Sequence, residues 1–183
     1  MLVNLTENDI NKIQIDEGIV ILDYKETTER ILAPTRGGAE FTVTPSIRDI
    51  EFDGRKGKTK GMQVKDGEDV SLKVNTLCCS QENLALAIPG ANVNTDTKKI
   101  TPGKFGLIPA TAYLKNIAIV TKMLDDTFKV LVVKNPMHEG SFGFKANSKS
   151  ENEHNLEMLG HYDATKDEDM WYIEESETNP IAN

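Results

Sequence analysis

The stretch with the most suggestive chemistry is Gly57-Lys58-Thr59, which has the residue types that end a phosphate-binding P-loop. The full motif requires another glycine five positions before Gly57, where this chain has Phe52. A helix must also follow the motif, and Lys60-Gly61 disfavours one. We therefore interpret the segment as part of a solvated basic loop rather than as a nucleotide site.

Metal binding and nucleophilic catalysis also lack residues at suitable spacings. His154 and His161 are seven residues apart in an expected strand, an odd spacing that would direct them to opposite faces. Cys78 and Cys79 are adjacent, without the two-residue gap of zinc-binding pairs, and we expect them to be small buried apolar side chains. The sequence predicts no catalytic residue, no metal ligand and no cofactor, although a site built from scattered residues stays open.

The composition indicates one soluble globular domain. The chain has 183 residues, of which 38% are hydrophobic and 27% charged, enough for a single core. It contains no apolar run of the roughly 20 residues that a membrane helix requires, and its amino terminus lacks the features of a secretory signal. We therefore expect no membrane partner, and the adjacent cysteines favour a reducing compartment.

The negative charge is concentrated at the carboxyl-terminal end. The net charge is −8, and residues 151–183 hold ten of the 29 acidic residues but only one of the 21 basic ones. The remainder of the chain is nearly balanced. Binding to duplex DNA calls for clustered positive charge, so this distribution disfavours a DNA-wrapping protein.

Short β-branched and alternating runs predict strands along most of the chain. Pro45 is typical of an edge strand or bulge, and Asp125-Asp126 of a hairpin turn. Residues 91–104 are expected to form a loop, and Leu156, Met158 and Tyr162 to share one strand face. The expected strands are 18–24, 40–53, 70–75, 113–123, 128–134, 142–144, 154–162 and 170–173.

One helix is expected over Ser80–Ile88. Ser80 is a good N-cap, Glu82 lies in the first turn, where the helix dipole favours an acidic residue, and Pro89-Gly90 ends the helix. Because Leu84 and Ile88 are four residues apart, we expect both to face the sheets.

A basic, glycine-rich segment covers residues 54–67. Its glycines exclude a helix and predict a long surface loop or an extended hairpin. We expect this segment to be poorly ordered in the isolated chain and to be ordered by contact with another subunit, the alternative being a solvated loop with no partner. The expected contact residues are Arg55, Lys56, Lys58, Lys60 and Lys65.

These elements together predict a mainly β fold, a β-sandwich or barrel-like domain with one short α-helix and a long extended loop. The expected organisation is an amino-terminal arm at 1–16, a sandwich domain at 17–173 and a carboxyl-terminal tail at 174–183.

Three segments resemble the amino-terminal half of a known family. They are 17–24 (EGIVILDY), 32–38 (LAPTRGG) and 48–61, which begins RDIEFDG and ends GKTKG. In their order and spacing they are similar to the tail tube proteins, or major tail proteins, of long-tailed bacteriophages that infect Gram-positive hosts. The specific part of the resemblance covers residues 17–90, and beyond residue 90 only the strand-rich character agrees.

The resemblance implies a structural virion protein that self-assembles into stacked hexameric rings, forming the tube that delivers DNA. Its implied partners are other copies of itself, a tape-measure protein, the tail terminator and distal tail proteins, and phage DNA that passes without specific binding. It implies a location in the virion tail, with the host cytoplasm during assembly, and no enzymatic activity. The alternatives are a baseplate or distal tail binding module with the same sandwich, and a small enzyme with a dispersed site.

Overall fold

The computed structural model describes residues 6–181 except 33, 146–147 and 149–150. Within this part the chain is mainly β, as predicted, with two short α-helices, α1 (Glu7–Asn11) and α2 (Gln81–Leu86), and a 3-10 turn, η1 (Ala110–Ala112). The strands are β1 Ile19–Leu22, β2 Arg30–Ile31, β3 Thr35–Asp49, β4 Gln63–Thr76, β5 Asn92–Asn94, β6 Lys99–Thr101, β7 Asn116–Lys122, β8 Phe128–Lys134, β9 Met137–His138, β10 His154–Leu159 and β11 Trp171–Ser176.

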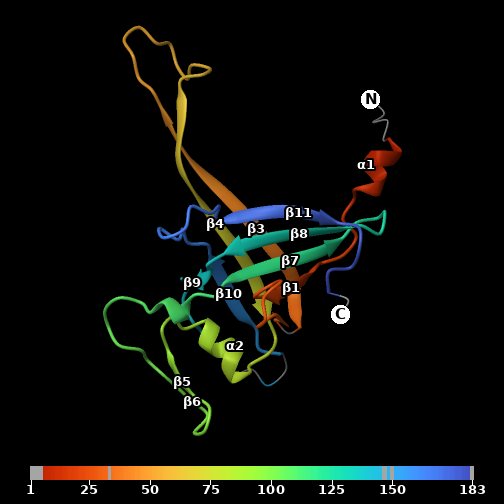
Figure 1. Ribbon diagram of the computed structural model, residues 1–183, viewed down its shortest axis with the longest axis vertical. Coiled ribbons are helices and arrows are strands. Elements are labelled where there is room, and N and C mark those ends of the chain that lie inside the picture. Colours follow the sequence, from red (N-terminus) through yellow and green to blue (C-terminus); the bar gives the residue numbers. More distant parts are fainter. Residues whose placement is uncertain (1–5, 33, 146–147, 149–150, 182–183) are drawn as a thin grey trace.

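The body is a sandwich of two antiparallel sheets (Figure 1). One sheet has the order β11-β8-β7-β1-β2 and the other the order β3-β4-β10-β9. Alternate residues of facing strands fill the space between them, because successive side chains of a strand point to opposite faces. The main core cluster contains Val20, Leu22, Ile117, Ile119 and Val133 from the first sheet, and Val70, Leu72, Val74, Leu156 and Met158 from the second.

The outer face of the five-stranded sheet is also covered. Ile21, Val120 and Val130 point away from the first cluster and form a second one. The rings of Phe128 and Tyr172 pack on it from the side. Strands β7 and β8 are therefore apolar on both faces, which explains why their sequences are nearly continuous hydrophobic runs.

Helix α2 begins as predicted but turns a different face to the core. The Ser80 hydroxyl accepts a hydrogen bond from the backbone N–H of Asn83 (3.3 Å). Asn83 and Ala87 are buried, whereas Leu84 and Ile88 are only half-buried, so the predicted core-facing pair is wrong. Apolar residues surround the helix after residue 83, and spacing alone could not select its inner face.

Several other local predictions need correction. A second helix, α1, forms in the amino-terminal arm, where Thr6 and Asp9 make a reciprocal capping box. Strands β5 and β6 form a hairpin within the expected loop 91–104. Strand β11 continues to Ser176, three residues beyond the boundary expected for the tail, because its edge pairs with β8 over all six residues. Strand β10 alternates as predicted, but it ends at Leu159 and leaves Tyr162 exposed.

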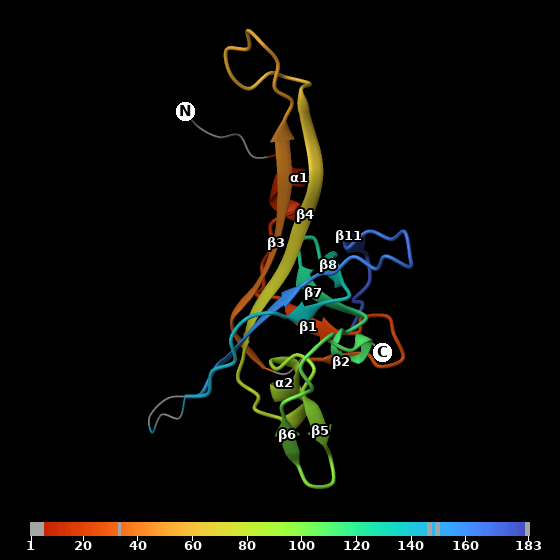
Figure 2. The ribbon, with the colours of Figure 1, turned by 90° about the vertical axis from the view of Figure 1, so that its left-hand side faces the viewer.

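The most conspicuous feature is the β3–β4 hairpin, which projects far beyond the sandwich (Figure 2). Its strands pair from Thr35–Thr76 at the base to Asp49–Gln63 near the tip, with register shifts after Arg36 and Ser46. Strand β3 is an edge strand, and Pro45 lies on it, as predicted. The other end of the molecule carries α2 and the β5–β6 hairpin (Figure 1).

Candidate assembly surfaces

The outer half of the β3–β4 hairpin stands free of the sandwich. In its inner half, Val70, Leu72 and Val74 are buried in the core. Beyond Thr44 in β3 and before Glu68 in β4, every described residue is exposed or half-buried. Ile47, at 59% exposure, is an apolar side chain without a covering layer.

The five basic residues predicted to contact another subunit lie at the tip of this hairpin and in its second strand. Arg55, Lys56, Lys58 and Lys60 lie in the connection 50–62, whereas Lys65 lies in β4 opposite Ile47. The predicted loop 54–67 is thus shorter than expected, since β4 already begins at Gln63. Of the two predicted forms, the extended hairpin is the correct one.

The five predicted contact residues divide into two groups by their ion pairs. Arg55 pairs with Glu51 and lies 4.0 Å from Asp49, both in its own hairpin. Lys65 pairs with Glu68. Among the described residues, no ion pair involves the other three, which are all exposed: Lys56, Lys58 and Lys60.

A side-chain contact ties the middle of the hairpin, where its outer half begins, to the opposite sheet. The indole Nε1 of Trp171 in β11 donates a hydrogen bond to Glu68 Oε1 (2.9 Å), and the Trp171 ring packs edge-on against Phe41 (5.9 Å between ring centroids). The hydrogen bond from Lys65, and then that from Trp171, lower the pKa of the Glu68 carboxyl. This contact, which joins residues 103 positions apart, is one that sequence patterns do not reveal.

Most of the acidic carboxyl-terminal charge is paired within the chain. Arg36 contacts Glu151 and Glu153, each at 2.9 Å, and Lys134 lies 3.1 Å from Glu168. Glu157, Glu174 and Glu175 also pair with lysines. Within the described part of the chain, three carboxylates of the loop before β11 make no ion pair: Asp163, Asp167 and Asp169.

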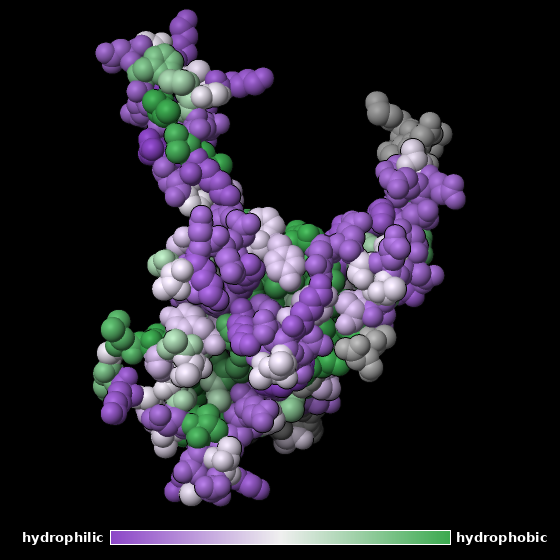
Figure 3. Space-filling model, viewed as in Figure 1, coloured by the Kyte–Doolittle hydropathy of each residue, from purple (hydrophilic) through white to green (hydrophobic). Residues whose placement is uncertain are grey.

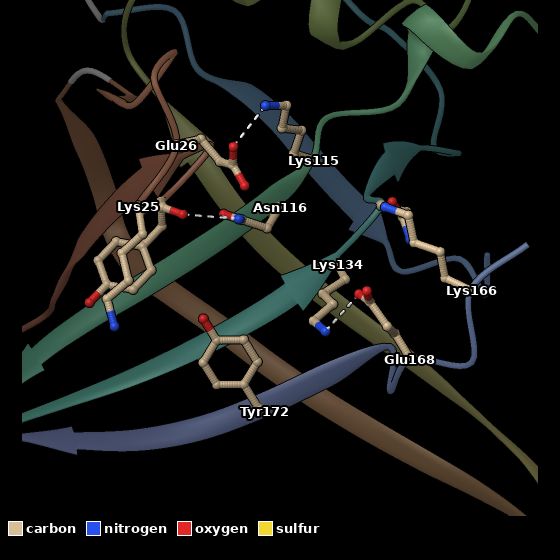
Figure 4. Close-up of a pocket in the computed structure, with 10 residues that line it drawn as sticks. Lys25, Glu26, Lys115, Asn116, Lys134, Lys166, Glu168 and Tyr172 are labelled. Carbon is tan, nitrogen blue, oxygen red and sulfur yellow. Dashed lines mark hydrogen bonds and ion pairs between the residues drawn. The ribbon is translucent and has the colours of Figure 1, made fainter.

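A cleft of about 520 Å³ lies beside the loop after β1 (Figure 4). Lys115 Nζ lies 2.7 Å from Glu26 Oε2, and the Asn116 side chain donates to the Tyr24 carbonyl oxygen (3.0 Å). Burial raises the pKa values of the Tyr24 and Tyr172 hydroxyls. Among the described residues, no serine, cysteine or histidine lines this cleft, and the ion pairs in it connect neighbouring segments of the chain.

One cysteine and one histidine meet in a way that the sequence did not predict. Cys79 Sγ lies 3.0 Å from His154 Nε2, and the rings of Phe142 and Phe144 pack against the imidazole. Cys79 is exposed and Cys78 half-buried, so the prediction that both are buried is wrong. The segment between β4 and α2 that carries them runs along the surface rather than through the core.

His154 of β10 and His161, which follows that strand, contact different side chains. His161 lies beyond the end of the strand, with Nε2 2.9 Å from Glu139 Oε1. In the described part of the chain, histidine, cysteine and carboxylate side chains do not gather in a group of three or more that could hold a metal ion. The described helices are all too short or too polar to cross a membrane.

Comparisons with known proteins give a likeness among solved structures. Protein-family models and curated proteins give no match. Among solved structures, a chain of the "Virion of native gene transfer agent (GTA) particle" is similar, with a TM-score of 0.48 and 11% identity over 82% of this chain and 96% of that one.

Proposed function

We propose that this protein is the structural subunit of a bacteriophage tail tube, which self-assembles into stacked hexameric rings that conduct DNA. The resemblance of residues 17–90 to tail tube proteins supports this proposal. The structural observation that carries the proposal is the outer half of the β3–β4 hairpin. It projects from the sandwich, and packing against another subunit would stabilise it.

An unsupported hairpin of this length is costly for a monomer. Two-stranded ribbons are marginally stable in water unless a further layer covers them. Here the outer half exposes Ile47 and Phe52 and carries three lysines without an ion-pair partner among the described residues. A neighbouring subunit that covered these side chains would supply the missing layer and order the tip.

A second copy of the same chain has the complementary charge. The loop before β11 carries Asp163, Asp167 and Asp169 without ion pairs in the described part of the chain, which matches the three lysines of the tip. Single exposed pairs contribute at most about 1 kcal/mol each, but repetition around a ring multiplies this contribution. We infer that the tip of one copy contacts the loop 163–169 of a neighbour.

Ring formation also removes a hazard of the isolated sandwich. Strands β3 and β11 are edges of their sheets, and no strand of the described part of the chain pairs with their outer sides. Open edges invite uncontrolled pairing, and pairing within a closed ring prevents it. The tape-measure protein, tail terminator and distal tail proteins would then meet the lumen and the ends of the tube.

The lumen of such a tube should let DNA slide. Each lysine or arginine bound to a phosphate would have to be released as the genome advances. We therefore expect the lumen to be acidic or neutral, consistent with the net charge of −8. A map of the tube showing a lumen lined mainly by lysine and arginine would contradict this expectation.

The proposed contact is tested with a triple variant, Lys56→Ser/Lys58→Ser/Lys60→Ser. Arg55 is left unchanged because it pairs within its own hairpin. The matched control, Lys98→Ser/Lys99→Ser/Lys145→Ser, removes the same charge from exposed residues elsewhere. We expect electron microscopy and sedimentation to show tubes for the parent and the control, and folded subunits without tubes for the tip variant. Tubes formed equally well by the tip variant would contradict the contact.

A further inference from the structure

The loop between β6 and η1, residues 102–109, displays two large apolar side chains to solvent. Phe105 and Leu107 have exposed fractions of 106% and 101%. Ile108 beside them and Val93 of the nearby β5 are also exposed. Figure 3 shows hydrophobic surface where this loop projects from the lower end of the molecule. Soluble proteins rarely leave such side chains together in water, and when they do, the patch is typically an interaction site.

The backbone of the loop explains why these side chains point outward. Gly103 packs directly on the chain after α2, and a Cβ there would overlap the carbonyl oxygen of Gly90. Gly106 has φ +128°, a conformation that other residues rarely adopt. The close contact at Gly103 holds the start of the loop, and Gly106 turns the chain between Phe105 and Leu107.

A recess lies on the same end of the molecule, between α2, β5 and η1. Its volume is about 240 Å³. Because a protein cavity of about 150 Å³ holds a benzene molecule, this recess has room for a phenylalanine ring. Its lining combines apolar side chains, among them Leu86, Ile88, Pro89, Val93 and Leu114, with an equal share of polar surface.

We propose that Phe105 and Leu107 of one copy insert into this recess of an adjacent copy. This inference rests on the proposed self-assembly. Each chain carries both the projecting side chains and the recess at one end of the molecule, so two identical copies present complementary surfaces to each other. One buried aromatic side chain covers about 150–250 Å², far below the roughly 1,200 Å² of a stable interface. The contact therefore anchors a larger interface, which the assembled ring provides.

The first test removes the projecting side chains. Phe105→Ser/Leu107→Ser deletes apolar groups that contact nothing in the monomer, so its melting temperature should match that of the parent. We expect the protein concentration needed for assembly to rise at least about tenfold, as for an interface hot spot. The control Lys104→Ser, at an exposed position of the same loop, should assemble like the parent. An unchanged assembly concentration for the double variant would overturn the proposal.

The second test identifies the occupant of the recess. In a Cys78→Ser/Cys79→Ser background, Leu107→Cys is placed in one chain and Ala112→Cys, which lines the recess, in another. After mixing and mild oxidation, a disulfide-linked heterodimer on a non-reducing gel supports the contact. Tubes that form without this band overturn the inference and leave the proposed function standing.

The same pair of substitutions in a single chain provides a further control. An intrachain disulfide in place of links between chains would show that the loop folds into its own recess, and it would also overturn the inference. If the parent forms no tubes at all, the proposed function fails. Cross-linking between chains at high concentration then still decides whether this contact exists.

Discussion

Removing the outer half of the β3–β4 hairpin should leave the monomer stable and abolish assembly. In the shortened chain, Asn-Gly replaces residues 47–66 and joins Ser46 to Gly67, which are paired neighbours in the ladder. A two-residue Asn-Gly turn matches the twist of antiparallel strands. None of the removed residues is buried, and Glu68 keeps its hydrogen bond with Trp171.

The expected change in the free energy of unfolding is small because no core is lost. Deletion of exposed side chains typically changes stability by about half a kcal/mol each way, and halving the length of a loop changes closure entropy by about 0.6 kcal/mol. The connection 50–62 is replaced by two residues, nearly three halvings of its length, which favours folding of the shortened chain by about 1.5–2 kcal/mol. We therefore expect no loss in the free energy of unfolding. By contrast, Leu72→Ala removes a side chain with 0% exposure from the inner half of β4. This substitution should lower the free energy of unfolding by about 2–5 kcal/mol.

Urea unfolding followed by the fluorescence of Trp171 measures both variants. A loss above about 2 kcal/mol in the shortened chain would show that the outer hairpin supports the monomer, and would refute its independence from the core. Sedimentation at the concentration where the parent assembles measures the second effect. Tubes formed by the shortened chain would refute the assembly role of the hairpin.

Three further outcomes are expected. Gly160→Ala should destabilise the sandwich by about 1–3 kcal/mol in urea unfolding, because the new Cβ would press on Val70 and Val133 between the sheets; a neutral effect would contradict this close packing. Burial lowers the pKa of His138, so the unfolded chain binds the proton more readily than the folded one. The free energy of unfolding should therefore fall as the pH is lowered from about 7.5 to about 5.5. The fall should be smaller in His138→Gln, and an equal fall in both proteins would contradict the role of His138. Raising the salt concentration should weaken tube formation measured by light scattering, and salt-independent assembly would argue against the lysine contacts of the tip.

The parts of the fold that the sequence predicted are those set by local patterning. The Ser80 cap, the strand alternation at Leu156 and Met158, and the edge position of Pro45 depend on neighbouring residues only. The buried runs of β7 and β8 follow from apolar residues on both of their faces. Local rules were sufficient there because each residue's environment agrees with its own preference.

The parts that the sequence did not predict depend on contacts between distant segments. Cys79 and His154 are 75 residues apart, and Glu68 meets Trp171 across the sandwich. Lys65 was expected in a loop or an extended hairpin, and its pairing with Ile47 of β3 places it in the paired part of the hairpin. The exposure of Phe105 is likewise invisible in a loop sequence, because it depends on the packing of Gly103 against Gly90.

Electron microscopy of the purified full-length protein, over a range of concentrations, tests the proposed tube assembly most directly. We expect six-fold rings that stack into tubes with an open lumen, with each hairpin covered by a neighbouring subunit. A protein that stays monomeric at every concentration, with the hairpin still exposed, would contradict tube assembly.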